Sequence, residues 1–265
     1  SFNLEIKNMY LTRIYGEEPL AFGEIFEQAW SWGQRLKPYV GDASLTIFEA
    51  LERGSNVLFE GAQGTLLDLD HGTYPFVTSS SPVAGGACVG AGLGPSLVGR
   101  VTGVVKAYNT RVGEGPFPTE LKEELGETLR ERGGEFGATT GRPRRCGWLD
   151  LVALKYAVRI NGIHALALTK LDVLSGFEAI PVCTGYRSDE GEDLPYKGNS
   201  VFLDSVEPVY RNMEGWKMDL GACRDFQDLP RPARDYIRFI EEQTGVPIVL
   251  VGVGPSRDQT IVMGL

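Results

Sequence analysis

Two segments of this chain have the same succession of elements: a helical stretch that ends at a glycine, followed by a short and almost wholly apolar run. Residues 149–160 end at Asn161-Gly162 and precede the run 163–168, while residues 233–244 end at Gly245 and precede the run 246–251. Short apolar runs bounded by turn residues indicate buried strands. Because parallel strands need a crossover connection that is usually a helix, this order predicts an α/β protein with a mostly parallel central sheet flanked by helices.

The rest of the sequence supports the same class. Further helices are expected at 22–36, after Asp42 up to Gly54, and at 121–132; further strands are expected at 56–59, 101–108 and 177–182. Residues 188–199 resemble a surface loop, and a small, mainly β insertion is expected near 183–228. Without a repeat or a clear linker, residues 1–265 are predicted to form a single α/β domain.

Composition excludes several classes of function. A net charge of −9 argues against binding nucleic acid or an anionic membrane. The sequence contains no apolar span of about 18 residues, the length that a membrane helix would need. The four cysteines are widely separated and form no CxxC pair, so the spacing favours neither a zinc site nor a disulfide framework. A reduced, cytoplasmic location is expected.

A candidate guanine-binding motif follows the apolar run 163–168, at Thr169-Lys170-Leu171-Asp172. Guanine presents two adjacent donors, N1–H and the exocyclic amine, and the two oxygens of one carboxylate, Asp172, can accept from both. The methylene stem of Lys170 would lie over the base. Such a site rejects adenine, which would leave the carboxylate unpaired. The alternative is an ordinary strand-to-loop turn with a solvated lysine and aspartate.

The stretch 65–95 is rich in glycine, serine, threonine and proline and has little periodicity, which is typical of long ligand-binding loops. Gln63 offers donors and an acceptor just before it, residues 78–81 supply hydroxyls, and glycines allow close approach to a ligand. The alternative is a flexible surface loop. His71 is given no role, because single histidines are more often structural.

Residues 138–145 combine two threonines, a glycine and three arginines, Arg142, Arg144 and Arg145. Guanidinium forks suit carboxylates and phosphates, and threonine hydroxyls complete the hydrogen bonding of an anion. This concentration of charge in an acidic protein predicts an anion-binding segment. A solvated basic turn is the alternative, although Pro143 would make it rigid.

Together these motifs resemble the adenylosuccinate synthetase family. The resemblance runs from about Asn56 to the C-terminus and rests on motifs in the family's order: EGAQGTLLD at 60–68, DHGTYPFVTSS at 70–80, GATTGR at 137–142, TKLD at 169–172 and VGP at 253–255. The family joins L-aspartate to C6 of inosine monophosphate (IMP) with GTP hydrolysis and Mg²⁺, through a 6-phosphoryl intermediate. The resemblance also implies a homodimer.

The resemblance implies a role for each matching residue. IMP would be held by Gln63, Thr78 and Arg142. The aspartate carboxylates would be held by Ala138, Thr139, Thr140, Gly141, Arg142, Pro143 and Arg144. GTP would be held by Arg144, Lys170, Leu171, Asp172, Gly252, Val253 and Gly254. Val253 stands where some relatives have a hydroxyl residue, so the backbone would make that contact.

The chain also departs from the family. Its members open with a glycine-rich phosphate loop that contributes a catalytic aspartate, followed by a catalytic histidine, and no GxxxxGK pattern occurs here. We therefore expect the C-terminal two-thirds of a larger P-loop-type ligase, with no catalytic or metal-binding residue in this chain and no activity of the chain alone. The alternatives are a guanine-nucleotide-binding regulatory module, which the lack of a DxxG turn disfavours, and an inactive structural fragment.

Overall fold

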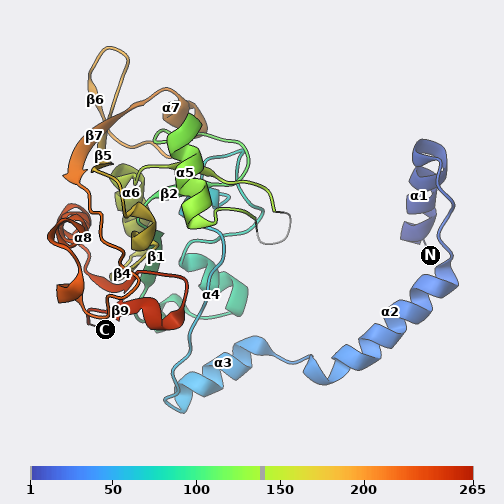
Figure 1. Cartoon of the computed structure of the whole chain (residues 1–265). Helices are drawn as coiled ribbons and strands as arrows, with labels where there is room; N and C mark the ends of the chain where they lie inside the picture. Colours follow the sequence, from blue (N-terminus) through green and yellow to red (C-terminus); the bar gives the residue numbers. More distant parts are fainter. Residues whose placement is uncertain (1, 138–140, 265) are drawn as a thin grey trace. The chain divides into compact units, whose positions relative to one another are not determined.

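The computed structural model describes residues 2–137 and 141–264 (Figure 1). Contacts within the chain divide it into two compact units, Ser1–Asn56 and Val57–Leu265. The predicted single domain stays a prediction. In the described residues, no helix is both long enough and apolar enough to cross a membrane.

The first unit is helical. It contains α1 (Phe2–Tyr10), a π-helical turn (Leu11–Tyr15), α2 (Phe22–Leu36), a 3₁₀ turn (Lys37–Tyr39) and α3 (Ala43–Glu52). Asp42 caps α3, since its carboxylate accepts from the backbone N–H of Leu45 at 3.0 Å. Phe22, Phe26 and Trp30 stack along α2 at one turn apart, with ring centroids 5.7 and 6.1 Å apart. The helices predicted at 22–36 and after Asp42 are confirmed.

The second unit is built on a four-stranded sheet in the order β1-β4-β8-β9. Its strands are β1 (Thr102–Lys106), β4 (Ala165–Thr169), β8 (Ile248–Gly252) and β9 (Thr260–Val262). The first three are parallel, and only β9 runs antiparallel to its neighbour. The register pairs Lys106 with Thr169 and Leu168 with Val251, so the carboxyl ends of β1, β4 and β8 meet at one edge. The predicted mostly parallel sheet is confirmed.

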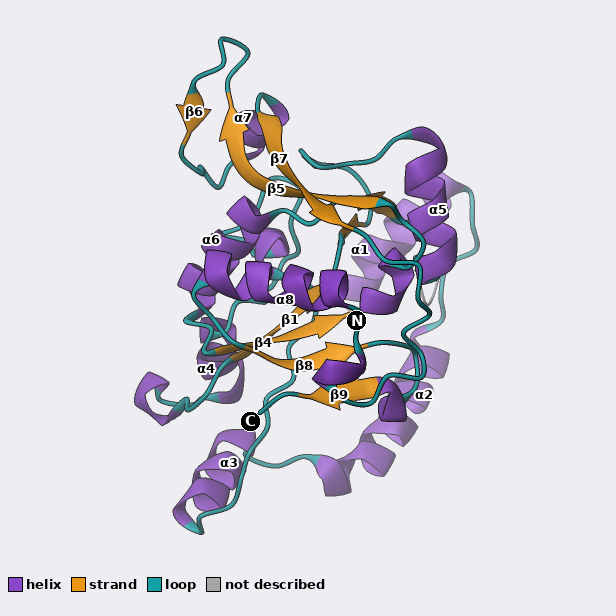
Figure 2. Ribbon diagram, turned by 60° about the vertical axis from the view of Figure 1, so that its left-hand side comes forward, coloured by secondary structure: helices purple, strands orange, loops and turns teal. Residues whose placement is uncertain are grey.

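Helices α6 (Leu151–Asn161) and α8 (Arg231–Thr244) pack against each other and lie on one face of this sheet (Figure 2). Figure 2 shows both of them between the sheet and the β5–β7 ribbon. Each helix ends at a glycine in the left-handed conformation, Gly162 and Gly245, as the sequence predicts. Apolar residues of strands and helices make one core, which includes Leu166, Leu168, Tyr236, Ile237, Ile240 and Val251. This packing fixes the strand ends that carry the candidate site.

The remaining elements surround this core. An antiparallel sheet of order β6-β5-β7 contains β5 (Ala179–Arg187), β6 (Asp193–Leu194) and β7 (Glu207–Glu214), and it confirms the predicted β insertion. A short pair joins β2 (Asn109–Arg111) to β3 (Arg145–Gly147). The other helices are α4 (Gly85–Ala91), α5 (Glu123–Gly133) and α7 (Ser200–Asp204). Single 3₁₀ turns lie at Thr65–Leu67, Pro95–Leu97, Leu171–Leu174, Phe226–Asp228 and Arg257–Gln259.

Three local predictions were wrong. The run 56–59 is not a strand, and Leu58 is 92% exposed. An apolar run becomes a strand only when a neighbour takes its backbone hydrogen bonds, and no described strand pairs with this one. The stretch 65–95 contains the helix α4, closed by left-handed Gly92, which its small residues concealed. The loop expected at 188–199 contains the short strand β6.

Candidate functional site

The predicted guanine-binding segments lie side by side at the carboxyl ends of β4 and β8. Lys170 follows β4 directly in a left-handed conformation (φ 60°) and starts the 3₁₀ turn that contains Leu171 and Asp172. Gly252 ends β8 so close to β4 that a Cβ on it would lie 3.4 Å from Cα of Thr169. Ligands of open parallel sheets bind outside such strand ends.

Residues 252–254 form a tight wall at this edge. Val253 is fully buried, and its backbone N–H donates to the carbonyl of Gln259 at 2.9 Å. A Cβ on Gly254 would come within 2.3 Å of the Gln259 side chain. Gly252 and Gly254 are therefore the partly exposed residues of this segment, while Val253 belongs to the core.

Asp172 is half-buried beside this wall. Burial raises the pKa of its carboxyl, and the nearby charge of Asp219 acts in the same direction. The backbone N–H groups of Asp172 and Val173 and the charge of Lys170 oppose the rise. A partly desolvated carboxylate at the end of a strand is suited to two donors of a ligand.

The two described flanks of the anion-binding segment, residues 135–137 and 141–144, pair with each other, and we call them together the anion hairpin. Its two sides pair through a bridge between Phe136 and Pro143, a bond from the N–H of Gly137 to the carbonyl of Arg142 at 2.8 Å, and a bond from the N–H of Arg144 to the carbonyl of Glu135 at 2.9 Å. The predicted aspartate-binding residues Ala138, Thr139 and Thr140 lie outside the described residues. Gly141 (φ 64°) and the exposed Arg142 and Pro143 follow them.

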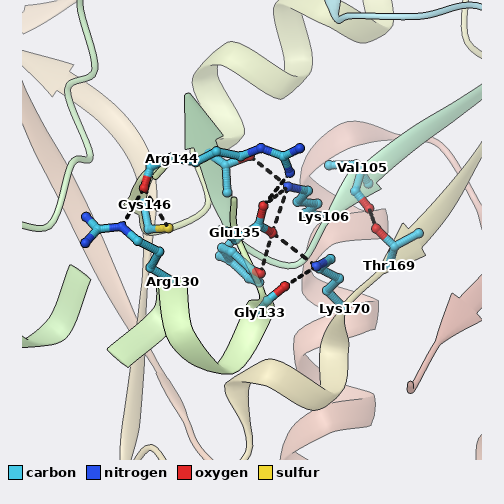
Figure 3. Close-up of polar contacts among 11 residues, drawn as sticks. Val105, Lys106, Arg130, Gly133, Glu135, Arg144, Cys146, Thr169 and Lys170 are labelled. Carbon is cyan, nitrogen blue, oxygen red and sulfur yellow. Dashed lines mark hydrogen bonds and ion pairs between the residues drawn. The ribbon is translucent and has the colours of Figure 1, made fainter. Parts of the chain in front are cut away.

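One buried carboxylate, Glu135, joins the anion hairpin to the strand ends (Figure 3). It accepts from Nζ of Lys106 at 2.8 Å on both oxygens, from the Tyr108 hydroxyl at 2.7 Å and from Nη1 of Arg144 at 2.7 Å. Nζ of Lys170 lies 3.3 Å from Oε1 and also donates to the carbonyl of Gly133. We call these five residues the Glu135 cluster: Lys106, Tyr108, Glu135, Arg144 and Lys170.

The cluster carries three cations around one carboxylate and therefore a net positive charge. Burial would raise the pKa of Glu135, but the hydrogen bonds from Lys106, Tyr108 and Arg144 outweigh it and lower that pKa to about 2. Burial lowers the pKa of Lys106, against the pull of Glu135. A surplus of positive charge at the carboxyl ends of parallel strands favours an anionic ligand.

Arg145 does not join this cluster, which corrects the sequence interpretation of three convergent guanidiniums. Its Nε and Nη2 donate to the two oxygens of Glu120 at 2.7 and 2.5 Å, and its Nη1 donates to the carbonyl of Gly115 at 2.8 Å. Arg145 begins β3, and these bonds hold its side chain towards the 113–120 loop. Its role is structural.

The loop that carries Gln63 and Thr78 is folded on itself. Gln63 is exposed with φ 63°, and the N–H of Thr78 donates to the carbonyl of Leu67 at 2.8 Å. Buried Asp68 accepts from the N–H groups of Asp70 and His71 at 3.0 and 2.9 Å. The loop is thus held by its own hydrogen bonds, and the joint role of Gln63, Thr78 and Arg142 stays a prediction.

Sequence reasoning missed Lys106, Tyr108 and Glu135. A signal existed for Lys106, because it lies near the end of the strand predicted at 101–108, just as Lys170 follows soon after the apolar run 163–168. Glu135 stands in the middle of a polar stretch, and its burial depends on partners from three distant segments. Within residues 2–137 and 141–264, no three His, Cys, Asp or Glu side chains gather as metal ligands would.

Comparison with known proteins shows the family to which the chain is similar. The family model described as adenylosuccinate synthetase matches residues 1–261. The chain is 55% identical over 262 residues to an adenylosuccinate synthetase of Desulfitobacterium hafniense, covering 99% of this chain and 61% of that protein. It is 57% identical over 260 residues to one of Gloeobacter violaceus, covering 97% and 59%. The chain therefore spans about 60% of the length of these relatives.

Two solved structures are also similar. Fully ligated adenylosuccinate synthetase from Plasmodium falciparum superposes with a TM-score of 0.92 at 41% identity, over 99% of this chain and 62% of that chain. The succinoaminodeoxyadenylate synthetase of cyanophage S-2L, bound to dGMP and dATP, superposes with a TM-score of 0.53 at 19% identity, over 84% and 50%. The second likeness concerns the fold alone.

Proposed function

Because the chain belongs to the adenylosuccinate synthetase family, we propose that the protein carrying it joins L-aspartate to IMP at the expense of GTP. The products would be adenylosuccinate, GDP and phosphate, in de novo AMP biosynthesis and purine salvage. One observation carries the proposal: Lys170, Asp172 and residues 252–254 lie together at the ends of neighbouring parallel strands, and Glu135 ties the anion hairpin to the same place.

Asp172 would read the guanine base. Its oxygens would accept from N1–H and the exocyclic amine, and the cost of burying them unpaired would reject adenine. The ammonium of Lys170 is held by Glu135 and the carbonyl of Gly133, which leaves its methylene stem to cover the base. Residues 252–254, of which Gly252 and Gly254 are partly exposed and Val253 is buried, would complete the guanine pocket.

The anion hairpin would receive the aspartate. Arg144 gives one Nη1 donor to Glu135, so its planar fork has a fixed orientation towards a carboxylate or phosphate. Arg142 lies on the exposed side of the hairpin and would reach both aspartate and IMP, with Gln63 and Thr78 holding the nucleotide. Ala138, Thr139, Thr140, Gly141 and Pro143 would complete the aspartate-binding turn.

A magnesium ion would accompany the GTP phosphates, as the family resemblance implies, and would neutralise charge that develops on the transferred phosphoryl group. The Glu135 cluster does not suit a metal, because its one carboxylate is already surrounded by three cations. We therefore assign the cluster to anion recognition and place no metal there. A cytoplasmic homodimer that binds neither nucleic acid nor membranes completes the proposal.

The test is the reaction itself with its energy donor varied. The purified complete protein that carries this chain is supplied with IMP, L-aspartate and Mg²⁺, and with either GTP or ATP, while adenylosuccinate is measured by chromatography. We expect product with GTP and at least about 10³-fold less with ATP, because a matched polar site rejects an unmatched base strongly. Equal turnover with the two nucleotides would contradict the guanine assignment, and no product with either would contradict the proposed ligase.

A further inference from the structure

Glu135 contacts both halves of the proposed recognition site. Its Oε2 accepts from Nη1 of Arg144, on the anion hairpin, at 2.7 Å, and its Oε1 lies 3.3 Å from Nζ of Lys170, in the guanine-binding turn. We propose that Glu135 is a positioning residue that couples the two halves, so that a ligand in the anion hairpin strengthens guanine-nucleotide binding and the reverse. This inference rests on the proposed function.

Two further side chains hold Glu135 in place. Lys106 donates to both carboxylate oxygens and to Oγ1 of Thr110, each at 2.8 Å, and so uses all three of its ammonium donors within the protein. Tyr108 donates to Oε1 at 2.7 Å. The Glu135 side chain is fully buried. Lys106 and Tyr108 therefore fix the carboxylate and leave contact with the ligands to Arg144 and Lys170.

The backbone adds a second link between the two halves. The N–H of Glu135 donates to the carbonyl of Arg130 at 2.8 Å, and Nε of Arg130 donates to the carbonyl of Arg144 at 2.8 Å, so the base of the anion hairpin is fastened to the end of α5. The carbonyl of Gly133, in the same helix end, accepts from Lys170. Gly133 is needed there, since a Cβ would lie 2.1 Å from the Tyr108 hydroxyl oxygen.

The sign of the coupling follows from this shared support. A ligand that orders Arg144 also restricts the motion that remains to the carboxylate and to the helix end against which Lys170 rests. A second ligand at Lys170 then meets a site that is already ordered, and its binding loses less entropy. Without the carboxylate, three cations would stand close together with no counter-charge, and each would relax away independently.

The experiment measures binding without turnover in the protein that carries this chain. The dissociation constant of GDP is measured by calorimetry alone and with saturating IMP and L-aspartate. We expect the two added ligands to tighten GDP binding at least about fivefold in the wild type, the lower end of typical coupling between sites. In Glu135→Gln, GDP should still bind, and this factor should fall to about one. A Glu135→Gln protein that keeps the wild-type factor would overturn the inference.

A matched control separates coupling from general damage. Glu120→Gln breaks the equally close carboxylate–guanidinium pair with Arg145, which touches neither half of the site. It should lower stability and leave the coupling factor unchanged. If Glu135→Gln does not fold, Lys106→Met replaces it, because Lys106 binds Glu135 and no proposed ligand. That variant should reduce the factor, and an unreduced factor would overturn the inference.

Failure of the inference differs from failure of the proposed function. A wild-type protein that binds GDP and ADP equally, or binds neither, has no guanine site, and the proposed function fails. A wild-type protein that prefers GDP and shows no tightening with IMP and L-aspartate keeps its guanine site, and only the coupling role of Glu135 fails.

Discussion

Neutralising Glu135 should destabilise the second unit at neutral pH, and the loss should shrink as the pH falls. The pKa of Glu135 is about 2 in the folded chain against an ordinary value of 4.5. At about 1.4 kcal/mol for each tenfold change in proton affinity, the charged form is favoured on folding by about 3 kcal/mol. Lys106, Arg144 and Lys170 are 25–35% exposed, so screening reduces the expected loss in Glu135→Gln to about 2–3 kcal/mol.

The way this loss of stability changes with pH follows from the direction in which folding shifts the pKa of Glu135. A lowered pKa means that the stabilisation is fully present above pH 4.5 and is lost as the pH falls towards 2, because the unfolded chain takes up the proton first. The difference in unfolding free energy between wild type and Glu135→Gln should therefore be largest at pH 7. At pH 3 it should be about half as large or less.

Urea denaturation at pH 7, 5 and 3 measures this difference, with tryptophan fluorescence as the signal. Trp148 and Trp216 are 6% and 4% exposed and belong to the core of the second unit, so they report its unfolding. Glu131→Gln, an exposed change in the last turn of α5, should alter stability by less than about 0.5 kcal/mol at every pH. A pH-independent loss in Glu135→Gln would refute the electrostatic argument and leave only packing.

Three further outcomes follow from the site and the core. In the complete enzyme, Asp172→Asn should weaken GTP use by about 2–4 kcal/mol and make XTP the better donor. The reason is that xanthine has a carbonyl, which can accept from the asparagine amide, where guanine has its amine. An unchanged ratio of kcat/KM for GTP and XTP would remove Asp172 from the guanine site. Arg142→Leu should cost about 2–4 kcal/mol in kcat/KM, mainly by raising KM for IMP or aspartate, and Arg142→Lys should restore little of this loss. A parallel loss of thermal stability would indicate that the arginine is structural. The 265-residue chain alone should give no measurable adenylosuccinate, since its sequence has no GxxxxGK phosphate loop, and product in proportion to its concentration would contradict this.

The sequence predicts the helix–strand units of the second unit well because their signals are local. Helix α6 (Leu151–Asn161) has the capping aspartate Asp150 before it and Gly162 after it, and the following strand is buried along nearly its whole length. The general rule that parallel strand ends meet then places Lys170 and Asp172 beside residues 252–254. Neither step needs knowledge of distant contacts.

The predictions that failed depend on such contacts. Residues 56–59 have the composition of a strand, and pairing with a distant strand decides whether one forms. Glu135 looks like a surface residue in sequence, and it is buried because Lys106 and Lys170 come to it from separate strand ends. Arg145 resembles its neighbour Arg144, but Arg144 bonds Glu135 and Arg145 bonds Glu120, and only the folded chain shows which partner each one meets.

At Lys170 the backbone conformation and the side-chain contacts favour different residue types, because the backbone is left-handed and the ammonium is bonded to Glu135 and Gly133. A side chain in this conformation costs about 1 kcal/mol, which glycine avoids and asparagine partly avoids. Lysine is therefore a poor choice for the turn and a good one for the contacts of its ammonium. A library of all residues at position 170, sorted for folding, should favour glycine and asparagine, while the same library sorted for guanine-nucleotide binding should return lysine.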